Sequence, residues 1–300
     1  IVQRNAELVA RWQSVGFCHG VLNTDNVSIL GLTIDYGPFG FLDGYRADHI
    51  CNGSDMDGRY TYEQQPAMVK WDLNKFTEVL RELVRDDTEA VAALETVVDA
   101  HFTPTLERVY RTQFQHKLGL TDGWRPGQDD ELLRSLLETM QQTGADFTKT
   151  FRLLASVRVG HAPTRTDCSS ESGTSTSSGA GESSHTESAE EKREKEEDEE
   201  EEEEEKEGLS AEELVRAVCC SPKQLGRAQL PNINPVHLQH MILLLYRDTG
   251  LLQRAGYSPD WILDMRRRLA RAAELSSESA ATKRERDLRL WKSWLASYRR

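Results

Sequence analysis

The sequence predicts a mainly α-helical protein with one small β-hairpin near its N-terminal end. From Trp71 onward, apolar residues recur every three or four positions, which is the spacing of one face of a helix. Between His19 and Asp43, by contrast, short apolar runs alternate with Gly, Asn and Asp, a composition typical of short strands and their turns. The chain has 300 residues, enough for one sizeable core or two smaller ones.

The first predicted element is a helix over residues 1–15. Leu8, Trp12 and Val15 stand at helical spacing, and no Ser, Thr or Asp precedes them as a cap. The chain also begins with Ile1 rather than Met. We therefore expect the sequence to be a fragment that starts inside a structural element.

The second predicted element lies in the stretch "VSILGLTI", residues 27–34. This stretch is interpreted either as two short strands or as a tight hairpin that turns at Gly31. In either form the two halves are antiparallel, so Asn26 before them and Asp35 after them are expected at the same end.

The remaining ordered elements are predicted to be helices. Leu73, Phe76, Leu80 and Leu83 form one apolar stripe, and "DELLRSLLETM" (residues 130–140) forms another. Beyond residue 208, Ser210 precedes Glu213 at the spacing of a capping box. A last stripe closes the chain, formed by Leu288, Trp291, Leu295 and Tyr298.

Residues 164–208 interrupt this pattern with a Ser/Thr/Gly-rich half followed by a Glu-rich half. The segment has no periodic apolar residues, so it cannot bury enough surface to offset its ordering entropy. We expect a disordered insert. It serves either as a solvated spacer or as an acidic segment that binds basic partners.

The net charge argues against nucleic acid as a partner. The formal charge is −13, but residues 182–207 hold sixteen acidic residues against four basic ones, a local net charge of −12. The rest of the chain is nearly neutral, so no global field favours nucleic acid or an anionic membrane.

No apolar run approaches the roughly 20 residues of a membrane span. The basic C-terminal helices suggest either an exposed helix face or RNA, and the apolar stripe opposite the charges favours the former.

The cysteines give little information about the fold or the function. The five cysteines include no CxxC pair, which argues against a disulfide framework in a chain of this size. Cys51 is interpreted either as a buried inert thiol or as a redox handle.

The candidate chemistry lies in the loop that begins at His19. Asn26 follows His19 by seven residues, the spacing of the protein-kinase catalytic loop H-R-D-x-x-x-x-N. Nine residues later, Asp35-Tyr36-Gly37 stands where kinases have the magnesium-binding D-F-G. Mg²⁺ prefers hard oxygen ligands and is usually held by one or two protein groups plus nucleotide phosphates. Asn26 and Asp35 fit that description.

One position departs from the kinase pattern. The Asp that acts as base in H-R-D is replaced by Val21, which cannot accept a proton. Either the site is silent as a kinase, or the neighbouring Asp25 supplies the base from a shifted position. A structural alternative also stands, in which Asn23, Thr24 and Asp25 merely form an Asx-type turn. His19 is interpreted as a structural residue that braces the loop.

Longer stretches resemble one family. "GFCHGVLNTDNVSILGLTIDYGPFGFLDGY" (residues 16–45) is similar to the signature of the selenoprotein O family, which consists of pseudokinase-like protein adenylyltransferases. The resemblance continues through "HICNGSDMDGRYTYEQQPAMVKWDL", "KLGL" and "DFTKTFRLL", so it covers roughly residues 1–160. It extends more loosely to the final "LWKSWLASYR".

The resemblance implies a kinase-like fold that binds ATP in a reversed orientation. It implies transfer of AMP from ATP to Ser, Thr or Tyr hydroxyls of protein substrates, with Mg²⁺, or alternatively Mn²⁺, as cofactor. Carried over by motif position, Asp25 would be the catalytic base, and Asn26 and Asp35 would be the metal ligands. Asp35 would also contact the nucleotide. A mitochondrial location is implied for a eukaryotic member.

Together these observations predict three regions. Residues 1–163 form the C-terminal lobe of a protein-kinase-like fold, residues 164–208 the insert, and residues 209–300 a helical extension. Because the nucleotide-gripping N-terminal lobe and the family's C-terminal tail are missing, the fragment alone is expected to be inactive. The alternatives are a catalytically silent pseudokinase or scaffold, and a true kinase, which Val21 disfavours.

Overall fold

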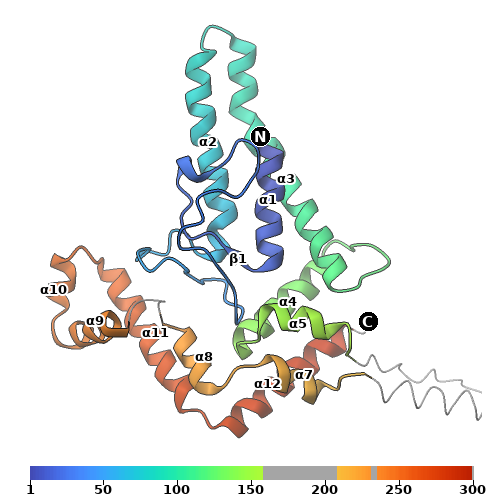
Figure 1. Cartoon of the computed structure of the whole chain (residues 1–300), viewed down its shortest axis with the longest axis vertical. Coiled ribbons are helices and arrows are strands. Elements are labelled where there is room, and N and C mark those ends of the chain that lie inside the picture. Colours follow the sequence, from blue (N-terminus) through green and yellow to red (C-terminus); the bar gives the residue numbers. More distant parts are fainter. Residues whose placement is uncertain (158–207, 231–234, 299–300) are drawn as a thin grey trace, which may run out of the picture.

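The computed structural model describes residues 1–157, 208–230 and 235–298. Within these ranges the protein is mainly helical, with one two-stranded antiparallel sheet (Figure 1). The prediction of a mainly helical protein with a small β element is therefore confirmed. Within the same ranges, no helix is both long enough and apolar enough to cross a membrane. The predicted insert, residues 164–208, lies outside the described residues except for Gly208.

Three helices form the N-terminal half. Helix α1 (Val2–Val15) packs against α2 (Gln65–Leu83) and α3 (Thr88–Lys117), and the latter two run side by side as a long hairpin (Figure 1). Apolar residues from α1, α2 and α3 build one hydrophobic core, which includes Val9, Leu73 and Phe102. Asp87 caps α3, because its side chain accepts hydrogen bonds from the first backbone N–H groups of that helix.

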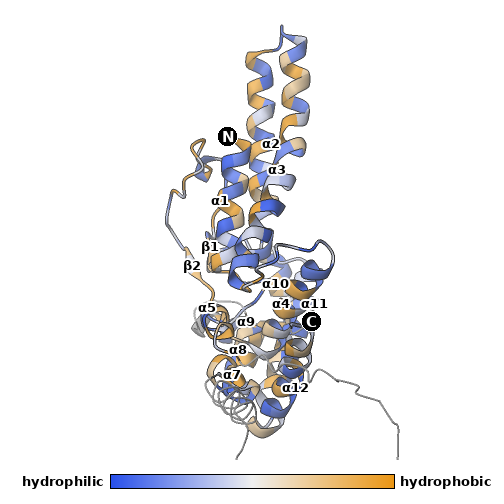
Figure 2. Ribbon diagram, turned by 90° about the vertical axis from the view of Figure 1, so that its right-hand side faces the viewer, coloured by the Kyte–Doolittle hydropathy of each residue, from blue (hydrophilic) through white to orange (hydrophobic). Residues whose placement is uncertain are grey.

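The sheet and two short 3₁₀ turns lie beside these helices. Strand β1 (Phe17–Cys18) pairs antiparallel with β2 (Gly40–Phe41), with Phe17 opposite Phe41. Turn η1 (Thr24–Asn26) lies in the long loop between the two strands, and η2 (Tyr62–Gln64) directly precedes α2. Figure 2 shows that the loop between β1 and β2 lies beside α1 and carries hydrophobic residues. Several of these are exposed, among them Leu30, Leu32 and Tyr36.

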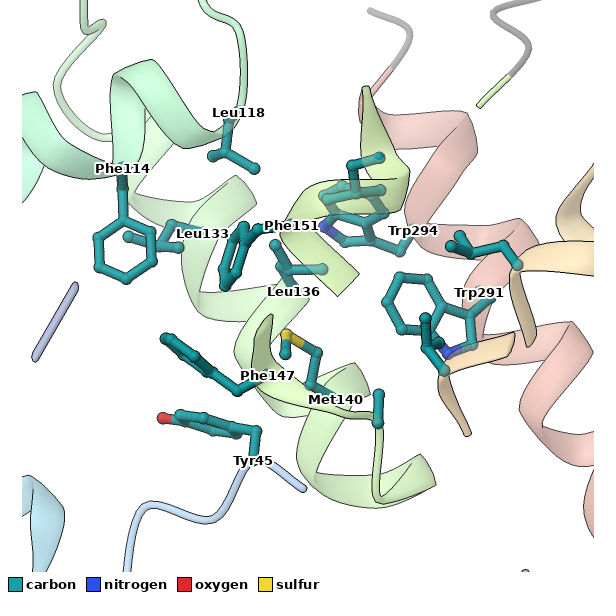
Figure 3. Packing of buried hydrophobic residues seen from close by; sticks show 14 of the residues in the cluster. Tyr45, Phe114, Leu118, Leu133, Leu136, Met140, Phe147, Phe151, Trp291 and Trp294 are labelled. Atoms are coloured by element: carbon teal, nitrogen blue, oxygen red, sulfur yellow. The ribbon is translucent and has the colours of Figure 1, made fainter. Parts of the chain in front are cut away.

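A second core joins parts of the chain that are far apart in sequence. Helices α4 (Gln128–Thr143) and α5 (Phe147–Leu154) pack against α7 (Ala211–Val218) and α12 (Ala280–Tyr298). Phe147, Phe151, Trp291 and Trp294 meet in its interior (Figure 3). The described segments on either side of residues 158–207 thus share one hydrophobic core.

Four further helices form the rest of the C-terminal half: α8 (Pro222–Ala228), α9 (Pro235–Arg247), α10 (Thr249–Arg254) and α11 (Pro259–Ser277). Helix α11 packs along α8, and a small third core gathers around Leu245 and Leu252. The helix α11 also contacts the N-terminal half, because the Trp261 ring nitrogen donates a hydrogen bond to the Met56 carbonyl.

Candidate functional site

The loop that carries the candidate site is folded back on itself by a glycine turn. Val27 and Thr33 form an isolated antiparallel bridge, and the Gly31 N–H donates to the Ser28 carbonyl at 3.1 Å. Gly31 has φ +70°, and a Cβ there would lie 2.6 Å from Cβ of Arg4. Both the backbone conformation and the space therefore require glycine. The predicted hairpin turning at Gly31 is confirmed, but as one bridge rather than two strands.

The register of this bridge determines where the predicted site residues lie. Asn26 directly precedes Val27, and Asp35 follows Thr33 by two residues. In an antiparallel pair, residues before one partner and after the other lie at the same end. The backbone thus brings Asn26 and Asp35 to one end of the hairpin, as expected, and Asp25 lies beside them on η1.

Asp35 has an unusual backbone conformation. Its φ of 54° makes it the one non-glycine residue with positive φ among the described parts of the chain. Its carbonyl accepts a hydrogen bond from the Gly37 N–H at 2.8 Å, which holds the tight turn. Left-handed non-glycine residues are uncommon and concentrate where function needs a particular side-chain direction.

His19 braces the loop from inside. It is fully buried, and its Nε2 lies 2.8 Å from the Ile34 carbonyl, next to Asp35. Its backbone N–H donates to Oε1 of Gln65 at 2.8 Å, and the Gln65 amide in turn donates to the Phe17 carbonyl. These contacts agree with the interpretation of His19 as a structural residue, because they tie the loop to the start of α2.

The three predicted site residues differ in exposure but share the lack of a side-chain partner among the described residues. Asn26 is 8% exposed, whereas Asp25 and Asp35 are exposed. Within the described parts of the chain, none of these side chains makes a hydrogen bond or an ion pair. One amide oxygen and one carboxylate at one end of a loop suit Mg²⁺, which keeps several water ligands. Among the described residues, no group of three or more His, Cys, Asp or Glu is found that could hold a metal ion.

Sequence reasoning missed a fourth polar residue, Asp72. It lies on α2, which packs against η1, and it is only 3% exposed. Burial raises the pKa of its carboxyl to about 6, while the positive charge of Arg59 lowers it and the negative charge of Asp25 raises it. A signal was present in the sequence, because Asp72 falls on the apolar stripe with Val69, Leu73 and Phe76.

The segment after the site is held close to the same loop. Both carboxylate oxygens of Asp55 accept backbone N–H groups, from Arg59 and Tyr60. The Tyr60 hydroxyl donates to the side-chain oxygen of Asn23, which precedes η1.

Cys51 lies against Cys18, with its thiol donating to the Cys18 carbonyl at 3.4 Å. The hydrogen bond with the Cys18 thiol lowers the pKa of Cys51. The two interpretations of Cys51, an inert thiol or a redox handle, both stay predictions.

A comparison with known families identifies one family for most of the chain. The family model described as protein adenylyltransferase SelO matches residues 1–216. The chain therefore belongs to the SelO family, the family that the sequence motifs predicted.

Individual relatives of the chain also carry the names of protein adenylyltransferases or nucleotidyltransferases. The mitochondrial protein adenylyltransferase SelO of Homo sapiens is 38% identical over 302 residues, which is 100% of this chain and 37% of that protein. The mitochondrial SelO-1 of Danio rerio is 35% identical over 299 residues, again 100% and 37%. The protein nucleotidyltransferase YdiU of Yersinia pestis is 47% identical over 169 residues, 56% of this chain and 33% of that protein. The chain thus spans about a third of its relatives' length.

Proposed function

We propose that this chain is the part of a Mg²⁺-dependent protein adenylyltransferase that carries the proton acceptor and the metal ligands. The observation that carries the proposal is the hairpin geometry, in which one bridge brings Asn26 and Asp35 to the same end of the loop. Family membership and the names of the relatives support it. In this proposal residues 1–163 correspond to a kinase-like C-terminal lobe, and residues 209–300 to a helical extension.

The reaction transfers AMP to a protein hydroxyl. Asp25 accepts the proton of a Ser, Thr or Tyr side chain, and the hydroxyl oxygen attacks the α-phosphorus of ATP. A new P–O bond forms, the bond to the β-phosphate oxygen breaks, and pyrophosphate leaves. General-base assistance of this kind contributes about 10²- to 10⁴-fold to a rate. Asp25 is exposed on η1, where the hydroxyl of a large substrate can reach it.

Asn26 and Asp35 hold the metal in this proposal, and Asp35 also lies next to the nucleotide. When bound, Mg²⁺ offsets the negative charge of the phosphates, the contribution that metal ions usually make to such transfers. The strained backbone of Asp35 directs its carboxylate, and the bond from His19 to the Ile34 carbonyl keeps that direction fixed.

Val21 argues against the ordinary kinase reaction. It occupies the position at which a kinase has its base, and valine cannot accept a proton. A silent scaffold remains the alternative from another class, but a scaffold has no physical need for an amide and a carboxylate left without partners. The mitochondrial names of the SelO relatives support a mitochondrial location.

The proposal is tested with a polypeptide of the relatives' length, because this chain spans 37% of the human relative. Asp35→Ala is expected to abolish labelling of protein by α-phosphate-labelled ATP. Asp86→Ala serves as the control and is expected to keep full labelling, because Asp86 is an exposed acid in the loop between α2 and α3.

Mass spectrometry of the labelled protein separates the three functions. Added AMP supports the proposal, an added phosphate indicates a kinase, and no modification indicates a scaffold. Labelling by Asp35→Ala at the wild-type rate would reject the metal assignment.

A further inference from the structure

Asp72 is a buried carboxyl group with no partner. Only 3% of the residue is exposed, and neither carboxylate oxygen accepts a hydrogen bond among the described residues. It lines a cavity of about 230 Å³ together with Thr24 of η1, Ser28 and Lys75. Asp72 therefore lies directly behind the turn that carries Asp25 and Asn26.

The two cations near Asp72 are engaged elsewhere. The Arg59 guanidinium lies over the rings of Trp71 and Tyr60, at 5.1 and 5.7 Å from their centroids. The ammonium group of Lys75 pairs with Glu78 at 2.8 Å. Neither forms an ion pair with Asp72 within the described residues, although the charges of Arg59 and Asp25 both act on it.

An acid in this position costs stability. A buried carboxylate without hydrogen bonds loses its hydration and gains nothing in return. An amide or an apolar side chain of the same size would fill the space on the stripe of Val69, Leu73 and Phe76 at lower cost. An unpaired buried acid beside a site needs an explanation, and a role in that site supplies one.

The turn above Asp72 offers matching donors. In η1 the Asn26 N–H is bonded to the Asn23 carbonyl, as expected for a 3₁₀ turn. The first N–H groups of such a turn, those of Thr24 and Asp25, have no partner inside it. No hydrogen bond from either N–H group is made to another described residue. Thr24, which carries one of these donors, and Asp72, which carries the free acceptor, thus line the same cavity.

We propose that Asp72 is a positioning residue for the transfer reaction, whose carboxyl group accepts the free N–H groups of η1 and so orients Asp25 and Asn26 when substrates are bound. This inference rests on the proposed function and adds to it a residue outside the loop. Because Asp72 acts through the turn, it affects the rate of transfer more than the binding of ATP.

The test compares two buried acids in the complete polypeptide. Asp72→Asn keeps the shape of the side chain but removes its charge and one acceptor oxygen. Asp129→Asn is the matched control, because Asp129 is also fully buried but is satisfied by the backbone and guanidinium of Arg125. For each variant, kcat and KM for ATP in AMP transfer are measured together with Tm.

Asp72→Asn is expected to lower kcat by about 10- to 100-fold, as misplacement of catalytic groups does, with KM for ATP nearly unchanged. Its Tm stays equal to that of the wild type or rises. Asp129→Asn shows the opposite pattern, a lower Tm with an unchanged kcat. A lower Tm for Asp72→Asn with wild-type kcat would show a packing role only and overturn the inference.

A separate readout keeps this inference distinct from the proposed function. If the wild-type polypeptide transfers no AMP, the proposed function fails, and Asp72 is then judged by hydrogen exchange of the Thr24 and Asp25 amides with Mg-ATP present. Slower exchange of these amides in the wild type than in Asp72→Asn supports the positioning role. Equal exchange in the two proteins overturns it.

Discussion

Trp261 donates a hydrogen bond from its ring nitrogen to the Met56 carbonyl at 2.9 Å, across 205 positions of sequence. Arg268, two turns further along α11, pairs with Asp48 at 2.8 Å. Both contacts fall on residues 46–61, the segment that follows the candidate site and contacts it through Tyr60. The helical extension therefore fixes the backbone of a segment that lies next to the proposed chemistry.

Loss of the Trp261 contact is expected to loosen that segment. Trp261→Phe keeps an aromatic ring but removes the donor, which leaves the Met56 carbonyl to water at a cost of about 0.5–1.5 kcal/mol. Hydrogen exchange of the amides of residues 46–61 is expected to speed up, while exchange in α2 and α3 stays unchanged. Leu263→Ala, on an exposed face of the same helix, is the control. Equal exchange in both variants would contradict the prediction.

Lys283 and Asp287 form a buried ion pair. The folded protein is expected to lose less stability when both residues are replaced than when Lys283 alone is replaced. Both side chains are about 2% exposed, and the Lys283 ammonium also donates to the Thr143 carbonyl at the end of α4. Lys283→Met leaves the Asp287 carboxylate buried with only the Arg286 contact at 3.4 Å. The free energy of unfolding in urea is expected to fall by about 3–5 kcal/mol.

The double variant Lys283→Met/Asp287→Leu provides the comparison. It removes both charges, so no unpaired carboxylate remains in the core, and the loss of stability is expected to be smaller than that of Lys283→Met alone. A double variant less stable than the single one would show that the pair itself contributes the stability.

Cys51 is expected to be the most reactive of the described cysteines. Its pKa is lowered by the hydrogen bond with Cys18, whereas burial raises the pKa of Cys219 to about 11. The thiolate is the form that reacts with iodoacetamide. At pH 7, Cys51 should therefore be alkylated at least about tenfold faster than Cys219, as read by peptide mass spectrometry.

The two alkylation rates are also expected to change differently as the pH rises. The alkylation rate of Cys219 should rise about tenfold per pH unit between pH 7 and 9, because this range lies well below its pKa. The rate of Cys51 should rise less steeply than that of Cys219 over this range, because the pKa of Cys51 is lowered. Cys18→Ala removes the hydrogen bond and is expected to slow Cys51 at pH 7. Equal rates at Cys51 and Cys219 would contradict the shifts.

Local sequence signals predicted the helices well. The expected helix over residues 1–15 is α1 (Val2–Val15), and the capping box from Ser210 to Glu213 is present at the start of α7. The last apolar stripe places Trp291 and Leu295 in the core. Helix caps and apolar periodicity act within one or two turns, so they can be identified without knowledge of the tertiary structure.

The site could be predicted only in part. The turn at Gly31 was expected because glycine is needed for its positive φ, and that turn determines where Asn26 and Asp35 lie. The contacts from Cys51 to Cys18 and from Trp261 to Met56 could not be predicted, because they join residues distant in sequence and depend on how the helices pack. The coordination of a metal by Asn26 and Asp35 stays a prediction.

The Leu209 N–H donates to the Ser156 carbonyl at 2.5 Å, and Val157 pairs with Leu209 in a parallel bridge. Val157 and Leu209, which lie on either side of residues 158–207 in the sequence, are therefore direct neighbours in space. Closing a longer chain at such a point costs only about 0.6 kcal/mol for each doubling of its length. For protein engineering, this junction is the place where a fluorescent reporter or an affinity tag can be spliced in with the least effect on folding.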